Sequence, residues 1–289
     1  MEQNARPLFQ RVAIVGVGLI GGSLGLAIRQ RGLAQAVVGV SHRSFRFHAA
    51  IEAGVIDEGS TAPSLVLPHC DLVILATPVE QICIDLARYA SLIAPNAVVT
   101  DVGSVKSRIV EVGEKHLLHN FVGGHPMAGS EKSGWEHARA DLFENATWAI
   151  TSTRQTSPNA RQCVRDLAEA VGARVVELSP QDHDRAVAVT SHLPHLLAYA
   201  LASVGGASAE TDPHLFDLAA GSWASGTRVA QSSPELWRGI VMTNRDALLR
   251  ALRDCQAELV QMENALEAGD DEALLQAFVR GYQAKKSGV

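Results

Sequence analysis

The chain has 289 residues, of which 47% are hydrophobic, and its formal net charge is −6. This length predicts two domains, and the acidic balance, without any basic tract, excludes nucleic acid as an expected partner. The longest apolar run, residues 13–20, is too short to span a bilayer, and the N-terminus lacks the apolar stretch of a signal peptide, so we expect a cytoplasmic protein with no membrane partner.

Short runs rich in Val and Ile predict strands at residues 12–16, 36–40, 72–76 and 97–101. The segments between the first three of them carry helical patterns or turn residues. Strands that alternate with helices predict an α/β fold with a parallel sheet covered on both faces. Further strands are predicted at residues 121–123, 148–151 and 174–178.

The pattern changes after Leu178, where only long helical stretches rich in Ala and Leu follow. We therefore expect a dinucleotide-binding domain over residues 1–178 and an all-helical domain over residues 179–289. The first helical pattern begins at a possible N-cap, Ser179 or Asp182. Pro194 lies inside this pattern and predicts a kink, because proline removes a backbone hydrogen bond.

A later helical pattern has apolar residues at alternating spacings of four and three, which is the spacing of a heptad seam. The seam is explained either by packing within the domain or by a helix–helix contact in a homodimer, and the sequence leaves both open. Its members are Leu248, Leu252, Cys255, Leu259, Met262 and Leu266.

A glycine-rich turn of the form GxGxxG lies between the first predicted strand and an apolar helix. Gly16 permits the tight turn, Gly18 lets a pyrophosphate approach the backbone, and Gly21 allows close helix–strand packing. Leu19 and Ile20 complete the turn. The helix N-terminus offers free N–H groups to phosphates, so we expect a dinucleotide cofactor here, the alternative being a purely structural turn.

The cofactor's ribose is usually bound by an acidic residue about twenty residues beyond this turn. Here Ser41, His42 and Arg43 occupy that place. A carboxylate would repel a 2′-phosphate, whereas a hydroxyl and a guanidinium can hydrogen-bond to it. We therefore expect NADP to be preferred, with NAD possible if Arg43 is an exposed charge that stacks on adenine.

Polar clusters follow the predicted strands at residues 100–106 (TDVGSVK) and 123–134 (GGHPMAGSEKSG). Ligands bind beyond the carboxyl ends of parallel strands, which places both clusters beside a nicotinamide. His125 lies between two glycines and a proline, so we expect it on a loop, either as a general base or as a surface histidine. Ser104 is expected to hydrogen-bond to it or to the substrate hydroxyl, or to cap a helix.

His192 and His195 share one helix face, a spacing that can bind metal. No third ligand and no HExxH pattern accompany them, so we expect no metal, and the pair serves hydrogen bonding or substrate contact. The four cysteines are far apart, without a CxxC pair, and we expect reduced thiols. Arg228 follows a Gly/Ser-rich stretch and is either a bidentate carboxylate clamp or an ordinary surface arginine.

Seven motifs in order resemble the prephenate and arogenate dehydrogenases of tyrosine biosynthesis: GVGLIGGSL, ATP, DVGSVK, GGHPMAGSEKSG, DHD, SHLPH and TRVAQSSPELW. The resemblance implies a Rossmann-type domain followed by a helical domain that forms a homodimer. It also implies oxidative decarboxylation of a cyclohexadienol. Hydride passes from the hydroxyl-bearing ring carbon to nicotinamide, the carboxylate leaves as carbon dioxide, and the ring becomes aromatic.

The resemblance assigns roles to residues of this chain. His125 is the base on the ring hydroxyl, Ser104 orients it, and Arg228 anchors a substrate carboxylate. One departure is that many members carry an Arg-Asp pair before the anchoring arginine, where this chain reads Trp223-Ala224-Ser225-Gly226-Thr227. The substrate pocket is expected to include Ser130, Glu131, His195 and Trp237, and the cofactor site to include Thr77, Pro78 and Asp101.

Arogenate and prephenate differ only in carrying an amino-acid or a keto-acid side chain. The Ser41–Arg43 segment, which can hydrogen-bond to a 2′-phosphate, resembles that of NADP-using, arogenate-oxidising members. Glu131 can pair with the ammonium group of arogenate. We therefore expect arogenate with NADP, with prephenate as the alternative. Other readings are a different two-domain NAD(P)-dependent dehydrogenase or imine reductase, and a non-enzymatic NADP-sensing dimeric scaffold.

Overall fold

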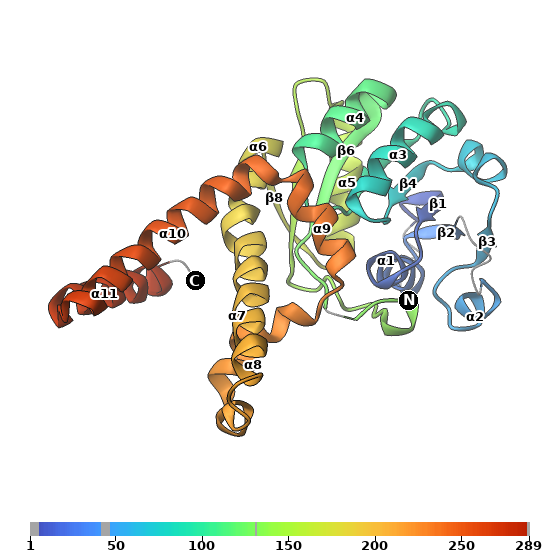
Figure 1. Ribbon diagram of the computed structural model, residues 1–289. Coiled ribbons are helices and arrows are strands. Elements are labelled where there is room, and N and C mark those ends of the chain that lie inside the picture. The colour runs from blue at the N-terminus through green and yellow to red at the C-terminus, as the bar shows by residue number, and fades with distance from the viewer. Residues whose placement is uncertain (1–5, 42–46, 131, 288–289) are drawn as a thin grey trace, which may run out of the picture.

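The computed structural model describes residues 6–41, 47–130 and 132–287. At its centre is one eight-stranded sheet with the strand order β3-β2-β1-β4-β5-β6-β7-β8 (Figure 1). The first six strands are parallel, in the order typical of a Rossmann fold, whereas β7 runs antiparallel to β6 and β8 parallel to β7. The strands are β1 (Phe9–Val15), β2 (Ala34–Val40), β3 (Glu58–Ser60), β4 (Leu72–Leu75), β5 (Val98–Asp101), β6 (Phe121–Pro126), β7 (Thr147–Thr151) and β8 (Arg174–Leu178).

Two buried clusters cover the two faces of this sheet. In β1, Val12 and Ile14 pack into the cluster shared with the first and fifth helices, whereas Ala13 and Val15 pack into the cluster shared with the third and fourth. This is why the strands read as continuous apolar runs, and the predicted α/β sheet with both faces covered is confirmed. The helices of this half are α1 (Leu19–Gln30), α2 (Phe47–Glu52), α3 (Val79–Tyr89), α4 (Ser107–Leu117) and α5 (Pro158–Ala170).

The structure corrects the expected position of His125. Strand β6 continues to Pro126 and pairs His125 with Ala149 of β7, so the histidine lies in a strand and not on a loop. The preceding glycines permit this, because a Cβ at Gly124 would lie 2.6 Å from the Asp101 carbonyl oxygen. The reading as a surface histidine is wrong as well, because the side chain is half-buried.

The helical half begins with α6 (Pro180–Val187), a π-helical segment at Ala188–His192, and α7 (Leu193–Ala209), which form one continuous helical stretch. Of the two predicted caps, Ser179 is the one used, because its hydroxyl accepts from the Asp182 N–H at 3.1 Å. The interruption predicted at Pro194 takes the form of the π turn just before it, where the Leu193 N–H donates to the Ala188 carbonyl. Such turns are frequent at functional sites.

The remaining helices are α8 (Gly221–Thr227), α9 (Pro234–Thr243), α10 (Arg245–Ala268) and α11 (Asp271–Ser287). No strand occurs among the described residues from 179 to 287, so the helical nature of this half is confirmed. Helices α10 and α11 lie against each other and extend away from the sheet (Figure 1). Packing within the domain buries Leu248 of the heptad seam but leaves Leu259 at 53% and Leu266 at 66% exposure.

One helical stretch in the described part of the chain, Pro180–Ala209, is long and apolar enough to cross a membrane by length and composition. A single stretch of this kind is weak evidence, because core helices pass the same test. Its first turns carry Asp182, His183, Asp184 and Arg185, and two of these side chains are buried against the sheet half. We therefore treat it as part of the fold that shapes the site.

Candidate active site

The glycine turn after β1 has the geometry that a pyrophosphate requires. Gly16 has φ +96°, and a Cβ on Gly21 would lie 2.1 Å from the Gly16 carbonyl oxygen, so both positions demand glycine. At Gly18, the N-cap of α1, nothing lies within 4 Å of an added Cβ. No acidic residue occupies the first turn of α1. A bare helix N-terminus beside open space fits a bound dinucleotide.

The carboxyl ends of four neighbouring strands bring the predicted chemistry to one edge of the sheet. Strand β1 ends at the glycine turn, β4 ends before Thr77, β5 ends at Asp101, and β6 carries His125 one residue before its end. From β1 the sheet extends to one side through β2 and β3, and to the other side through β4, β5 and β6. In open α/β sheets, ligands bind in the crevice at the point where the strand order changes direction, which here lies between β1 and β4.

A buried ion pair fixes the loop after β5 to β6. The Lys106 ammonium contacts the Asp101 carboxylate, both side chains are fully buried, and Lys106 also donates to the Gly124 carbonyl at 2.7 Å. Asp101 accepts from the Gly103 N–H at 2.8 Å and from the Gly124 N–H at 3.1 Å. Burial raises the pKa of Asp101 and lowers that of Lys106, and the opposite charge of each partner acts against these shifts. This pair therefore sets where His125 lies.

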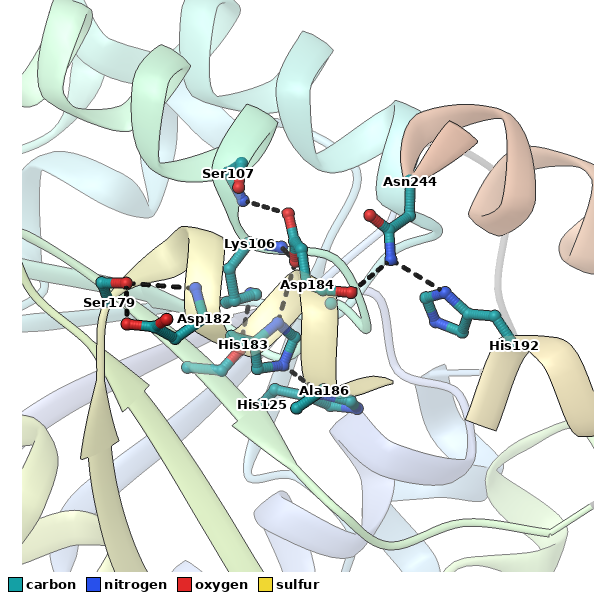
Figure 2. A network of polar contacts seen from close by, with 12 residues as sticks. Lys106, Ser107, His125, Ser179, Asp182, His183, Asp184, Ala186, His192 and Asn244 are labelled. Atoms are coloured by element: carbon teal, nitrogen blue, oxygen red, sulfur yellow. Dashed lines mark hydrogen bonds and ion pairs between the residues drawn. The ribbon is translucent and has the colours of Figure 1, made fainter. Parts of the chain in front are cut away.

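A second group of contacts joins His125 to the helical half (Figure 2). The His125 Nδ1 atom lies 2.8 Å from Nε2 of His183, and the Nδ1 atom of His183 lies 2.9 Å from the Asp184 carboxylate. Asp184 also accepts from the backbone N–H groups of Lys106 at 2.7 Å and Ser107 at 2.8 Å, where α4 begins. One carboxylate of α6 thus caps a helix of the sheet half.

The environment sets the charge of these groups near neutral pH. Burial holds the pKa of His125 well below 6.5, and the nearby charges of His183 and Lys106 act in the same direction. Burial also lowers the pKa of His183, although its hydrogen bond to Asp184 opposes the shift. Burial alone would raise the pKa of Asp184, but hydrogen bonds from His183, Ser107 and Lys106 outweigh it and leave the pKa lowered. His125 is therefore neutral and Asp184 ionised.

Further side chains gather beyond the π turn. The Asn244 amide nitrogen lies 2.8 Å from the Asp184 carbonyl oxygen and 3.1 Å from Nδ1 of buried His192, whose pKa burial lowers to about 4. The His195 ring stacks on Trp237 with 3.4 Å between the ring centroids. Burial lowers the pKa of His195, and the charge of nearby Arg228 contributes. The structure thus places Trp237 against His195 and Arg228 near His195.

Two family models match successive parts of the chain. Residues 24–177 match the prephenate dehydrogenase nucleotide-binding domain, and residues 179–280 match the prephenate dehydrogenase dimerization domain.

The chain belongs to the prephenate dehydrogenase family.

Three relatives place it within that family. It is 36% identical to a prephenate dehydrogenase of Bacillus subtilis over 92% of this chain and 73% of the relative. A prephenate dehydrogenase from A. aeolicus, crystallised with hydroxyphenyl propionate and NAD+, superposes with a TM-score of 0.86 at 32% identity, over 96% of this chain and 97% of the other. An arogenate dehydrogenase from Synechocystis superposes with a TM-score of 0.83 at 32% identity, over 97% of this chain and 100% of the other. This member is therefore an NAD(P)-dependent dehydrogenase of tyrosine biosynthesis.

Two of the three contacts predicted for Ser104 are not made among the described residues of this protein. Within the described residues, its hydroxyl forms no hydrogen bond to His125, whose protein partner is His183 instead. Ser104 does not cap a helix either, because α4 begins at Ser107 and its first N–H groups bind Asp184. The side chain stays half-buried in the loop after β5, where the substrate hydroxyl is the predicted partner that remains.

The three residues predicted to contact the cofactor at the ends of β4 and β5 have different outcomes. Asp101 is fully buried, and its carboxylate is shared by Lys106 and two backbone N–H groups, so it has no surface with which to contact a cofactor. The prediction for Asp101 is wrong for that reason. Thr77 is half-buried and donates to Asp85 at 3.0 Å, while Pro78 is exposed at the start of α3. Both remain at the cofactor edge.

The other residues predicted for the substrate and cofactor sites lie either at the edge of the site or outside the described residues. Ser130 is exposed, and its hydroxyl accepts from the Lys132 N–H at 3.2 Å. Ser41 follows β2 and donates its N–H to the Ser60 carbonyl at 3.2 Å. Leu19 and Ile20 open α1 and are half-buried. The remaining three, which lie outside the described residues, are His42, Arg43 and Glu131.

Sequence reasoning assigned no role to four residues that build this site. Lys106, His183 and Asp184 lie inside the DVGSVK and DHD motifs, so the resemblance had pointed at them without giving their function. Asn244 carries no comparable signal, because its partners in the hydrogen-bond network are 52 and 60 residues away in the sequence.

Proposed function

We propose that this protein catalyses the oxidative decarboxylation of arogenate with NADP, and that prephenate and NAD are the alternative substrate and cofactor. The observation that carries the proposal is His125. It is half-buried at the carboxyl end of β6, its Nδ1 is held by His183, and its pKa lies well below 6.5. A neutral imidazole in this place is a suitable base for a ring hydroxyl.

The residues support the following division of work. When bound, nicotinamide supplies the hydride acceptor. His125 accepts the hydroxyl proton, which pushes electron density toward hydride loss, and Ser104 hydrogen-bonds the same hydroxyl. Arg228, beside His195 and Trp237, binds a substrate carboxylate. Loss of carbon dioxide then makes the ring aromatic, which drives the reaction. Ser130, Glu131, His195 and Trp237 are proposed to line the pocket.

The preference for NADP is supported by the residues that follow β2. Ser41 stands where an acidic residue would bind the ribose of NAD, and no carboxylate follows it before the next helix, α2. Initial rates of nicotinamide reduction, measured with arogenate and prephenate against NADP and NAD, test the proposal. Turnover restricted to arogenate with NADP supports both choices. Turnover with prephenate and NAD overturns both of them, and no turnover in any pairing overturns the reaction itself.

We also propose a homodimer formed through the helical half, with the domain boundary at residues 178/179. Support comes from the match of residues 179–280 to a dimerization domain and from apolar side chains that the described monomer leaves exposed. On α10 and α11 they are Leu259, Val260, Leu266, Leu275, Phe278, Val279 and Tyr282. A homodimer contact through these helices would cover such apolar side chains.

Gly18→Ala should weaken cofactor binding about 10-fold while leaving the melting temperature nearly unchanged. A methyl group at this position meets nothing within 4 Å in the protein, so it projects into the space reserved for pyrophosphate. Gly21→Ala is the contrasting variant, because its Cβ meets the Gly16 backbone and should lower stability as well. Cofactor titration by fluorescence and a thermal melt separate the two. Unchanged affinity in Gly18→Ala would place the pyrophosphate elsewhere.

Arg228→Ala should raise the KM for the substrate about 10- to 100-fold with a smaller change in kcat. A bidentate guanidinium–carboxylate contact is worth a few kcal/mol in both the ground state and the transition state. Arg161→Ala, on the exposed face of α5, is the control and should leave KM unchanged. Steady-state kinetics with saturating cofactor make the comparison, and an unaltered KM in Arg228→Ala means that the anchor is another residue.

A further inference from the structure

His125, His183 and Asp184 form one hydrogen-bonded line across the boundary between the two halves of the chain (Figure 2). His125 comes from β6, whereas the other two residues come from α6. His183 is 1% and Asp184 6% exposed, and neither is expected to touch substrate or cofactor. Any effect of these two side chains on the reaction must therefore act through His125.

With His183 neutral, as burial favours by lowering its pKa, the hydrogen atoms along this line have one consistent placement. An ionised carboxylate can only accept, so the Nδ1 of the neutral His183 carries the hydrogen and its Nε2 is the lone-pair nitrogen. His125 must then donate its Nδ1–H to His183 Nε2. This leaves the lone pair of His125 on Nε2, which has no protein partner among the described residues and is not sealed in the interior.

We propose that His183 and Asp184 are positioning residues that hold His125 in the Nδ1–H tautomer and stabilise the imidazolium that it becomes. The inference rests on the proposed function, in which His125 is the base. The charge of Lys106, from the loop before α4, disfavours a positive charge on His125, although Lys106 is itself paired with Asp101. Asp184 is the negative charge that reaches His125 through hydrogen bonds, because His183 lies between the two.

The proton and electron movements balance within this arrangement. The hydroxyl O–H bond breaks, and its proton forms a new bond to Nε2 of His125. The freed electron pair forms the carbonyl as hydride leaves the ring carbon for the nicotinamide. When the carboxylate departs as carbon dioxide, its bonding pair restores the aromatic ring, and the oxygen takes the proton back. Throughout, Nδ1–H of His125 remains bonded to His183.

The test compares His183→Leu with His183→Gln. Leucine cannot accept the Nδ1–H of His125, whereas the glutamine amide oxygen lies near the position of Nε2 and can. We expect kcat to fall about 10- to 100-fold in His183→Leu, the effect of losing one charge-assisted hydrogen bond, with the substrate KM within about twofold. His183→Gln should restore most of kcat. His116→Leu, exposed at the end of α4, is the control and should leave kcat unchanged.

A second measurement is independent of turnover. Long-range ¹H–¹⁵N spectra of the imidazoles in the intact protein should show His125 as the Nδ1–H tautomer, and that state should be lost in His183→Leu. Wild-type kcat in His183→Leu, no recovery in His183→Gln, or an Nε2–H tautomer in the wild type would each overturn the inference. If His125 shows the Nδ1–H tautomer but the protein turns over no substrate, the positioning of His125 by His183 stands and only the proposed function is overturned.

Discussion

His125→Ala is expected to lower kcat by about 10²–10⁴-fold while the dissociation constant for the cofactor changes little. The expected loss is that of a general base whose contribution appears mainly in the transition state. His125 is half-buried and hydrogen-bonded to His183, so the variant also leaves a small space beside buried His183. Circular dichroism and cofactor titration establish that the variant is folded and binds, and steady-state rates then report the chemistry.

The pH dependence of the wild type gives an independent test of the same role. Burial lowers the pKa of His125 well below 6.5, so the neutral base is retained as pH falls through the ordinary range of a histidine. The acid limb of kcat/KM should accordingly lie below pH 6.5 and should disappear in His125→Ala. Wild-type turnover in the variant, or a limb near 6.5 that survives the substitution, would exclude His125 as the base.

Lys106→Met should reduce the free energy of unfolding by about 3–5 kcal/mol, because it leaves the carboxylate of Asp101 buried without its counter-charge. Lys106 and Asp101 are both fully buried, and the two groups share the backbone of Gly124. Urea unfolding with an unchanged m-value measures the loss. Lys115→Met, exposed on α4, is the matched control and should stay within about 0.5 kcal/mol of the wild type.

The double variant Lys106→Met/Asp101→Asn separates charge burial from packing. The N–H groups of Gly103 and Gly124 bind different oxygens of Asp101, so an asparagine can accept from only one of them. Because it is neutral, however, it removes the uncompensated buried charge, and the double variant should be more stable than Lys106→Met alone. A double variant that is less stable than the single one would show that the uncompensated charge is not what destabilises it.

The sequence predicted those parts of the fold that depend on local pattern. Continuous Val and Ile runs mark the buried parallel strands, and the spacing of Gly16, Gly18 and Gly21 marks the turn, because the turn joins one strand directly to the helix that follows it. Strand β3 went unpredicted because its three residues, Glu58–Ser60, are polar and gain their pairing only from β2.

The site was harder to predict wherever a contact is distant in sequence. A serine three residues before a helix suggests a cap, but α4 is capped by Asp184, 77 residues beyond Ser107. Gly-Gly before His125 and Pro after it suggest a loop, but the glycines here let β6 approach Asp101 closely and pair with β7. Local preference was overridden by tertiary packing in both cases.

With His125 as the proposed base, the line from Asp184 to His125 means that neither half of this enzyme is catalytically complete by itself. The sheet half contributes His125, and the first helix of the helical half contributes the two residues that are hydrogen-bonded in line with it. A chimera that exchanges the nucleotide-binding half for that of a relative, for instance to alter cofactor choice, must keep a residue at 183 that matches the new histidine. A substitution at 183 is therefore expected to be tolerated only when the new side chain can still accept the Nδ1–H of His125, as glutamine can.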